Sequence, residues 1–437
     1  MSGRRALLRL PLGLILAALV CVALVAWGHG DLTEPPTQAA LAAEPIRVLD
    51  QGHENRFPSS VRFALKAEGD APIAKATVYY RVADQAITAY APAALTPGLR
   101  VSAEHVLDLR RFYMPPGVEV HYRWRLEDAA GRTVETAWVG FVLEDLRFQW
   151  RTARAQNVEL KWYRGGDEFG EALLQTAIRA LGRLRTEAGV EVGRTIRIYI
   201  YGSEADFQSA ADPGTHEWAG GRAFVRESVI LIAASPSSMD FARRTVAHEL
   251  SHVVVYQATR NPYGGPPTWL DEGLAMLAEG DLQPNFARAL QSAIREDRLF
   301  SAWALSSSFP TDTREAELSY AQSYSLVRFV IDRYGRDAMS RLLAEFREGS
   351  TYDDALQAAL GVDTYGLDDA WRASLGLRPA LVGAATPAAS LERPASVLPP
   401  TPTPPARGAG VCALPAAALL GGSALAVAAS VRRGWRS

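Results

Sequence analysis

Hydrophobic and polar residues alternate with a period of two along several short segments between residues 46 and 145. This period is typical of strands with one buried face, and the segments are rich in Val, Tyr, Thr and Phe, which favour strands. The predicted strands are 60–66, 75–82, 104–109, 118–126 and 133–143. Turn signals rich in Gly, Pro and Asp separate them at 68–70, 96–98, 115–117 and 128–131. We therefore expect residues 46–145 to form an all-β sandwich of the immunoglobulin or fibronectin type, which acts as a spacer or as a partner-binding module.

From residue 148 to residue 378, apolar strand patterns alternate with segments of helical period. Strands are predicted at 157–163 and 195–201, a hairpin at 218–225 and 228–233, and helices at 168–188, 204–211 and 241–257. After residue 279 the period is helical, and the predicted helices are 286–296, 315–334, 336–348, 352–360 and 366–375. Gly335, Gly349 and Gly361 follow three of these helices, as glycines at helix C-termini do. This region is expected to be an α+β domain that ends in a helical subdomain.

Both ends of the chain are apolar. Arginines precede an apolar run near the N-terminus, so residues 1–28 are typical of a signal peptide or an N-terminal anchor, with a linker at 29–45. Residues 379–410 are rich in Pro, Ala and Thr and predict an extended linker. The 21 residues 411–431 carry no charge and precede a basic tail at 432–437, which is typical of one membrane span with a cytoplasmic end. A sorting tail that is removed by processing is the alternative.

Composition narrows the class of protein. The 437 residues are enough for two or three domains with a proper core, and the net charge of −2 gives no indication of nucleic-acid binding. The two cysteines, Cys21 and Cys412, both lie in the apolar terminal segments. The domains between them therefore have no disulfide, and their stability must come from burial of apolar surface.

The predicted helix 241–257 carries the segment His248-Glu249-Leu250-Ser251-His252. Histidines four residues apart lie one turn apart on the same helix face, where both imidazoles reach a single Zn²⁺. Glu249 is rotated by roughly 100° from His248, which places its carboxylate beside the metal, where it takes a proton from metal-bound water. Paired histidines on an apolar helix also occur as core or capping residues, but the glutamate in this register favours a zinc site.

A catalytic zinc needs a third protein ligand and an open fourth position. The segment 269–275, with the sequence Trp-Leu-Asp-Glu-Gly-Leu-Ala, begins another predicted helix over 269–279 and offers the carboxylates of Asp271 and Glu272. A carboxylate at the start of a helix is also favoured by the helix dipole alone. Together with the His-Glu-His segment, these residues resemble the gluzincin zinc metallopeptidases of the peptidase MA-like superfamily, related to the aminopeptidase-N and thermolysin catalytic domains.

The resemblance implies a role for each of these residues. In the aminopeptidase-N-like branch, a W-L-x-E-G-[FL]-A segment supplies the third ligand, so His248, His252 and Glu272 are implied to bind one Zn²⁺ per chain. Glu272 is preferred over Asp271 because it matches the register of that motif. Glu249 is implied to be the general base. A Y-x-K-G-A segment of the family supplies a tyrosine hydroxyl to the oxyanion, and Tyr320 matches its register, although Ser323 replaces the glycine.

Two alternatives and one departure accompany this resemblance. Tyr324, one helical turn after Tyr320, could share its face, or both tyrosines could simply pack in the helical core. Aminopeptidases of the branch carry a G-x-M-E-N segment whose glutamate binds the free amine of the substrate. The corresponding stretch here is 220–227, which does not fit, and Glu227 at its end is expected to be a turn residue. An endopeptidase or a protease of narrow specificity is therefore expected rather than an exopeptidase.

The sequence as a whole predicts a zinc-dependent peptidase that hydrolyses peptide bonds in a peptide or protein substrate by means of a zinc-activated water. Its terminal segments predict a single-pass protein of a bacterial cell membrane, with the catalytic domain outside the cytoplasm. Two other classes stay open. One is a surface protein with an inactive zinc fold whose β-domain binds a partner, and the other is a metal-dependent hydrolase that cleaves a bond other than a peptide.

Overall fold

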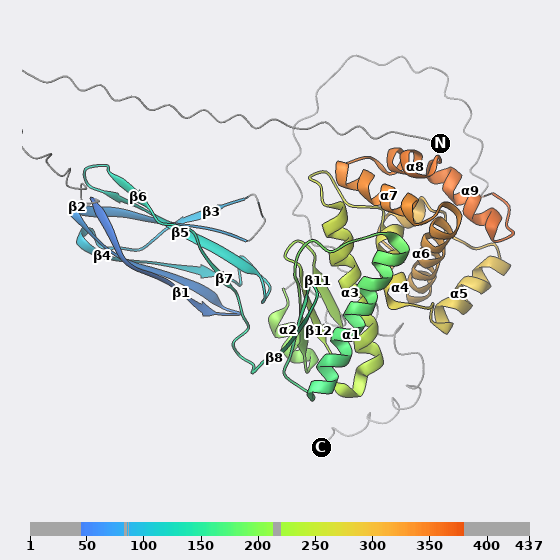
Figure 1. The fold of residues 1–437 in the computed structure, drawn as a ribbon, viewed down its shortest axis with the longest axis horizontal. Coiled ribbons are helices and arrows are strands. Elements are labelled where there is room, and N and C mark those ends of the chain that lie inside the picture. Colours follow the sequence, from blue (N-terminus) through green and yellow to red (C-terminus); the bar gives the residue numbers. More distant parts are fainter. Residues whose placement is uncertain (1–44, 83–84, 86, 213–219, 380–437) are drawn as a thin grey trace, which may run out of the picture. The chain divides into compact units, whose positions relative to one another are not determined.

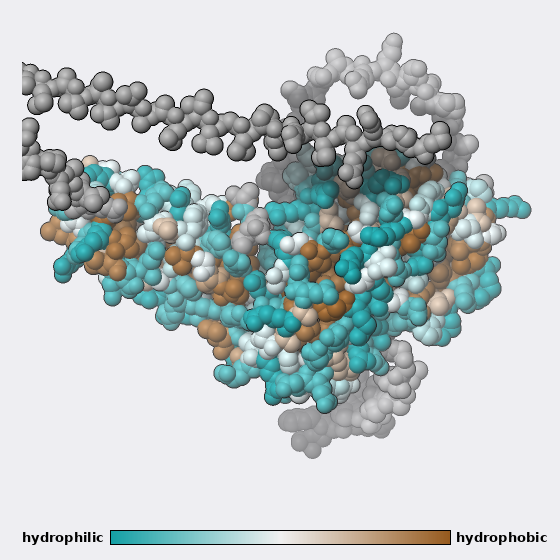
Figure 2. Space-filling view, viewed as in Figure 1, coloured by the Kyte–Doolittle hydropathy of each residue, from teal (hydrophilic) through white to brown (hydrophobic). Residues whose placement is uncertain are grey.

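The computed structural model of the protein describes residues 45–82, 85, 87–212 and 220–379. The predicted N-terminal signal or anchor, the predicted span at 411–431 and the basic tail lie outside these residues, as do nearly all of both linkers. Within the described residues, no helix has the length and hydrophobicity needed to cross a membrane. On the face drawn in Figure 2, hydrophilic residues predominate and hydrophobic residues form small, separate groups.

The first described region is a seven-stranded antiparallel sheet. Its strands are β1 Ile46–Arg56, β2 Ser60–Val82, β3 Ala89–Pro92, β4 Gly98–Asp108, β5 Glu119–Asp128, β6 Thr133–Glu135 and β7 Val139–Val142. The prediction of a turn at 68–70 is wrong, because β2 continues through these residues and joins two of the predicted strands. Strands β1 and β3 were not predicted, and the predicted strand 133–143 is divided into β6 and β7.

The long strand β2 links the two halves of this sheet. Its first half pairs with β1 and β4, and its second half pairs with β3 and β5, with register shifts between Glu68 and Lys75. Side chains from the two halves meet in one core: the ring of Phe63 lies 4.9 Å from that of Tyr122, and His53 stacks on Phe141 at 3.7 Å. Strand β2 is therefore irregularly paired where a turn was predicted. Such irregular pairing allows a strand to bend without ending.

A second, five-stranded sheet follows, in the order β11-β12-β10-β9-β8. Its strands are β8 Arg151–Ala155, β9 Val158–Trp162, β10 Ile196–Tyr201, β11 Gly221–Phe224 and β12 Val229–Ala233. Strands β9, β10 and β12 are parallel, whereas β8 and β11 run antiparallel to their neighbours at the two edges. The predicted hairpin is confirmed by the pairing of β11 with β12, and only β8 was not predicted.

The two faces of this sheet belong to different cores, because successive side chains of a strand point to opposite sides. On β10, Ile198 and Ile200 face a core shared with helices, whereas Tyr199 and Tyr201 face the core that includes the first sheet. Strand β12 divides in the same way, with Ile230 and Ile232 on one side and Val229 and Leu231 on the other. A sheet covered on both faces explains why these strands read as continuous apolar runs.

Nine α-helices are described in this region: α1 Asp167–Arg183, α2 Glu204–Ala210, α3 Met239–Thr259, α4 Thr268–Glu279, α5 Pro284–Arg295, α6 Thr313–Tyr334, α7 Arg336–Glu348, α8 Tyr352–Leu360 and α9 Thr364–Ser374. Their existence and approximate bounds are as predicted, and Gly335, Gly349 and Gly361 follow α6, α7 and α8 with positive φ angles. Helix α3 lies between the sheet and the helices α4 to α9 (Figure 1), and it contacts α1, α4, α7 and β10 to β12. The described chain is thus a sheet-rich N-terminal region followed by a sheet covered with helices.

Candidate metal centre

Helix α3 carries both histidines and is well defined at its start. Ser235 and Ser238 form a capping box around the short 3₁₀ turn Pro236–Ser238, and α3 begins at the next residue. This satisfies backbone groups that a helix start would otherwise leave without partners. His248 and His252 then lie on one face of the helix, with their ring centroids 4.9 Å apart.

Helix α4 brings a carboxylate to this face. Its Gly273 lies so close to α6 that an added Cβ would be 2.4 Å from the carbonyl oxygen of Ser323, so only glycine permits this approach. Its neighbour Glu272 is 5% exposed, and its Oε2 lies 3.4 Å from His248 Nε2 and 3.8 Å from His252 Nε2. The three side chains offer ligand atoms that all lie within 4.8 Å of one another, as a shared metal ion requires.

The other nitrogen of each imidazole faces a second carboxylate. His248 Nδ1 lies 2.8 Å from Glu279 Oε1, and His252 Nδ1 lies 3.1 Å from Asp271 Oδ2. Such partners orient the rings and set the tautomer that leaves Nε2 free to bind a metal. Asp271 therefore occupies the outer side of His252, away from the group formed by the two Nε2 atoms and Glu272.

Glu279 was not identified from the sequence. It lies seven residues after Glu272 on α4, so the two carboxylates share one face of the helix and reach opposite nitrogens of His248. Gln283 Nε2 donates to Glu279 Oε2 at 3.3 Å, which holds this carboxylate in place. The helical spacing from Glu272 was the signal available in the sequence, but an acidic residue at the end of a helix is too common to be informative alone.

The pKa values of the centre follow from burial and from this concentration of charge. Burial alone would lower the pKa of His248, but Glu272 and Glu279 outweigh it and raise that pKa well above its usual value. Burial is likewise outweighed at His252, where Asp271 and Glu272 raise the pKa to about 9. Burial raises the pKa of Glu249, and the two histidines oppose this effect. Without a metal, the carboxylates thus hold protons on the imidazoles.

Glu249 points to the edge strand β11 and is buried. An added Cβ on Gly221 would lie 3.2 Å from Glu249 Oε1, and the backbone of Ala223 is a hydrogen-bond partner of this carboxylate. The other oxygen, Oε2, has no hydrogen-bond partner although it is buried. The carboxylate therefore lies between the two histidines and the edge strand, with one oxygen held and one oxygen available.

The register of β11 shows which of its backbone groups face outwards. Ala233 N donates to Gly220 O, so the hydrogen-bonded positions of the antiparallel pair β11–β12 continue at every second residue, at Arg222 and Phe224. The backbone groups of Gly221 and Ala223 therefore face away from β12. Strand β11 is the last strand of the sheet, so these groups lie at its edge, where the residues of β11 are buried beside α3.

The opposite side of β11 is anchored to its surroundings. The Arg222 side chain is 4% exposed, and its Nη2 donates to Asp212 Oδ2 at 3.0 Å. The ring of Tyr113, from the first sheet region, lies 5.5 Å from that of Phe224, and the Tyr113 hydroxyl donates to Ala210 O at 2.7 Å. Strand β11 has only four residues and pairs with one neighbour. The side-chain contacts of Arg222 and Phe224 therefore help to hold it in place.

Tyr320 lies beside the histidines, on α6. Its ring centroid is 6.2 Å from that of His248, and its side chain is 5% exposed in an apolar cluster with Phe286 and Phe309. Tyr324, one turn later, is partly buried at the margin of the same cluster. The structure therefore brings the ring of Tyr320 to the centre, and both tyrosines also take part in packing.

Glu227 lies away from the centre, in the turn between β11 and β12. Its Oε1 accepts a hydrogen bond from Gln85 Nε2 at 3.1 Å, and burial raises the pKa of its carboxyl group. The sequence-based expectation of a turn position agrees with this placement, since Glu227 N donates to Phe224 O across the turn.

Residues 176–376 match the model of the family described as Peptidase MA superfamily. This part of the chain, which is less than half of the 437 residues, is similar to that superfamily. The matched range includes all residues of the centre described above, on α3, α4 and α6. No curated protein sequence is similar enough to the chain to be identified as its relative.

Three solved structures with similarity to this chain have low identity and low TM-scores. One is the M1 zinc metallopeptidase from Deinococcus radiodurans, with 13% identity and a TM-score of 0.31 over 76% of this chain and 92% of that one. Another is Legionella pneumophila aminopeptidase A, with 10% identity and a TM-score of 0.32 over 73% and 48% of the two chains. The third is an aminopeptidase N family protein from Idiomarina loihiensis, with 9% identity and a TM-score of 0.34 over 69% and 71%.

The residues present in the matched range fit a zinc ion. Both histidine Nε2 atoms are buried and have no hydrogen-bond partner, although buried polar atoms are almost always satisfied. Two imidazole nitrogens and one carboxylate oxygen are a common ligand set of catalytic zinc, with one further position left for water or substrate. A metal ion at this position would satisfy both nitrogens at once.

Proposed function

We propose that this chain is a zinc-dependent endopeptidase of the H-E-x-x-H gluzincin type. One observation carries the proposal: two buried imidazole nitrogens without partners converge on the Glu272 carboxylate, and the buried carboxylate of Glu249 lies next to them. In this proposal His248, His252 and Glu272 hold the metal. Glu279 and Asp271 orient the two imidazoles through their Nδ1 atoms.

A zinc ion in this centre supplies a Lewis acid that lowers the pKa of water towards about 7 and polarises the scissile carbonyl group. The protein supplies the proton transfers. Glu249 Oε2 accepts a proton from the attacking water and later delivers it to the leaving amine. Burial supports this role, because it raises the pKa of Glu249 and makes its carboxylate a stronger base than one in water. The hydroxyl group of Tyr320 is proposed to donate to the developing oxyanion.

Strand β11 is the proposed substrate-binding edge. In this proposal an extended peptide adds to the sheet by main-chain hydrogen bonds at the outward-facing side of β11, beside Gly221, while the backbone of Ala223 bonds to Glu249. Because Glu249 lies against the same two residues, a peptide on this edge has its backbone beside the base. Strand β11 itself contains no acidic residue to bind a free amine, which favours cleavage within a chain over removal of single residues.

The setting of the enzyme is part of the proposal. We infer from the terminal segments that residues 411–431 anchor the protein in a bacterial membrane, with residues 46–145 and 148–378 outside the cytoplasm. The first region is proposed to be a sandwich of the immunoglobulin or fibronectin type, in which β2 passes from one layer to the other.

The test compares the full chain, with and without a chelator, on a mixed peptide library whose cleavage positions are read by mass spectrometry. We expect cuts inside peptides that disappear with the chelator and return with zinc. Glu249→Gln should keep its zinc, measured by metal analysis, and lose about 10²–10⁴-fold in turnover. Glu168→Gln, on the exposed start of α1, is the matched control and should behave like the wild type.

Three outcomes would change this assignment. Wild-type turnover by Glu249→Gln would exclude Glu249 as the base. Trimming of single N-terminal residues would show an aminopeptidase. Bound zinc with no cleavage of any peptide would favour another substrate or a binding role.

A further inference from the structure

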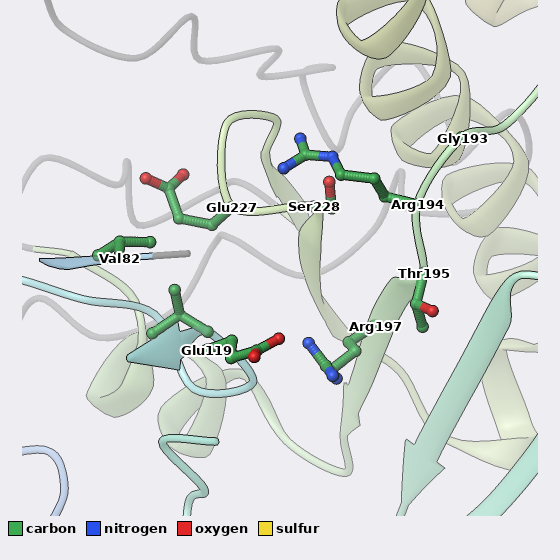
Figure 3. A pocket seen from close by; sticks show the side chains of 9 residues that line it. Val82, Glu119, Gly193, Arg194, Thr195, Arg197, Glu227 and Ser228 are labelled. Atoms are coloured by element: carbon green, nitrogen blue, oxygen red, sulfur yellow. The ribbon is translucent and has the colours of Figure 1, made fainter. Parts of the chain in front are cut away.

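A separate pocket of about 320 Å³ lies between the start of β5, the segment before β10 and the turn that joins β11 to β12. Figure 3 shows the side chains that line it. They combine two arginines, two glutamates, two hydroxyl groups and two valines; with Gly193 the lining residues are Val82, Val118, Glu119, Arg194, Thr195, Arg197, Glu227 and Ser228. None of these residues belongs to the metal centre.

Opposite charges face each other across this pocket. Glu119 and Arg197 point towards one another in Figure 3, but each of them interacts with a different residue. Glu119 Oε1 lies 2.8 Å from His121 Nε2, whereas Arg197 Nη1 donates to Gly117 O at 3.1 Å and its Nε lies 3.8 Å from Glu159 Oε2. The carboxylate and the guanidinium thus remain on opposite sides of a gap, and each keeps further hydrogen-bonding capacity.

The second pair of charges lies on the other wall of the pocket. Arg194 and Glu227 come from the segments before β10 and β12, with the Ser228 side chain between them in Figure 3. Glu227 is held by Gln85, whose Nε2 donates to its Oε1 at 3.1 Å. The Arg194 backbone is fixed by Gln257, whose Oε1 accepts from Arg194 N at 3.1 Å.

We propose that this pocket binds a small zwitterion, namely a free amino acid or a dipeptide. Its carboxylate pairs with the guanidinium of Arg197 and its ammonium group pairs with Glu119, while Val82 and Val118 contact the side chain. A simple anion would meet the two glutamates, and a simple cation would meet the two arginines, so neither matches the lining as well. The volume admits a molecule of one or two residues but not an extended chain.

This assignment rests on the lining of the pocket and does not depend on peptidase activity. The test is therefore made on zinc-free protein, in which a metal-dependent peptidase has no turnover. Isothermal titration calorimetry with L-alanine and L-alanyl-L-alanine should detect binding to the full chain at millimolar concentrations. N-acetyl-L-alanine lacks the ammonium group and L-alaninamide lacks the carboxylate, so each should bind at least about tenfold more weakly.

Variants locate the binding. Glu119→Gln changes a side chain that is 44% exposed, and Arg197→Gln removes the opposing charge; each should weaken dipeptide binding at least about tenfold. Glu127→Gln on the same strand and His252→Ala at the metal centre are the controls and should bind as the wild type does. Melting temperatures check that each variant is folded.

The proposal is wrong if neither zwitterion binds, or if the blocked derivatives bind as tightly as L-alanyl-L-alanine. Unchanged affinity in folded Glu119→Gln protein would also exclude it. Loss of binding in His252→Ala alone would move the ligand to the metal centre.

Discussion

Two polar clusters with buried members lie on opposite sides of the five-stranded sheet region, and they differ in how their polar atoms are satisfied. The metal centre holds His248, Glu249, His252 and Glu272. The second, which we name the tyrosine–carboxylate cluster, consists of Glu144, Asp145, Arg147, Lys161, Tyr199 and Tyr201. Both contain several ionisable groups in a protein interior, where an unpaired polar group is costly.

In the tyrosine–carboxylate cluster, the acids find donors within the protein. Tyr199 donates to Glu144 Oε2 at 2.8 Å, and Tyr201 donates to Asp145 Oδ2 at 2.9 Å. Arg147 binds both oxygens of Asp145, at 2.8 and 2.7 Å. Burial, followed by the adjacent carboxylate, raises the pKa of each tyrosine far above its usual value, so these hydroxyls stay protonated donors.

The metal centre lacks this balance. His248 Nε2, His252 Nε2 and Glu249 Oε2 are buried without hydrogen-bond partners. A fold that satisfies one buried cluster and leaves another incomplete on the same sheet does so for a reason, because each unsatisfied group costs about 1–3 kcal/mol. The difference between the two clusters is that the metal centre leaves several polar atoms without protein partners, whereas the tyrosine–carboxylate cluster pairs its acids with donors from the protein.

The largest expected effect comes from removing a ligand at the metal centre. His252→Ala should lose nearly all bound zinc and all measurable turnover, because two remaining ligands do not hold a catalytic zinc. Metal analysis of purified protein and a peptide assay measure the two losses. If this variant kept one zinc per chain, His252 would not be a ligand, and the contrast between the clusters would weaken.

Removing the hydroxyl group of Tyr320 tests the chemistry while leaving the packing in place. Tyr320→Phe keeps the ring against His248 and Phe309, so zinc content should not change. Turnover should fall about 10²-fold if the hydroxyl donates to the oxyanion. Tyr324→Phe is the matched control on the same helix. Equal turnover of the wild type and Tyr320→Phe would show that Tyr320 serves packing alone.

A substitution in the tyrosine–carboxylate cluster should affect stability and not zinc binding. Asp145→Ala should lower the free energy of unfolding of the metal-free protein by about 1–3 kcal/mol, because it leaves the buried Tyr201 hydroxyl without its partner, whereas the exposed Arg147 keeps Ser209. Urea denaturation measures this loss. Zinc content per folded chain should stay at the wild-type value, and a loss of zinc without a loss of stability would reverse the roles of the clusters.

The smallest expected effect is a gradual change of zinc affinity with pH. Zinc binds neutral imidazoles, so protons compete with it below the pKa of each histidine. This pKa is about 9 for His252, so zinc affinity should keep rising well above pH 7. The expected rise is about tenfold per pH unit for each proton that zinc displaces. Chelator competition between neutral and alkaline pH measures the slope. A plateau near the usual histidine pKa would contradict the raised value.

The same shift has the opposite sign for the stability of the metal-free protein. The folded-state pKa of His252 is raised, so its contribution to stability is fully present below the unfolded pKa and is lost as pH rises to about 9. Unfolding of zinc-free protein should show this loss, and His252→Ala should lack it.

Local patterns in the sequence predicted most of the catalytic region. Apolar runs of strand length, the capping serines before α3 and the glycines after α6, α7 and α8 are signals that neighbouring residues carry. The His-Glu-His segment and Glu272 were found in the same way, because helical spacing and a recurring motif are visible without a fold. In the first region the residues at 68–70 led to the wrong prediction of a turn. Pairing on both sides of β2 keeps the strand extended there.

The sequence by itself determined which residues are candidates for the metal chemistry and where most of the helices and strands lie, because these depend on short-range patterns. Only the tertiary structure decided that Glu279 and Asp271 take the outer nitrogens, that Glu249 meets the edge strand, and that Glu227 lines a different pocket. These contacts join residues from different elements. They depend on how far one helix is displaced along its neighbour, which a local sequence pattern does not predict. Packing sets that position, through close approaches such as that of Gly273 to α6.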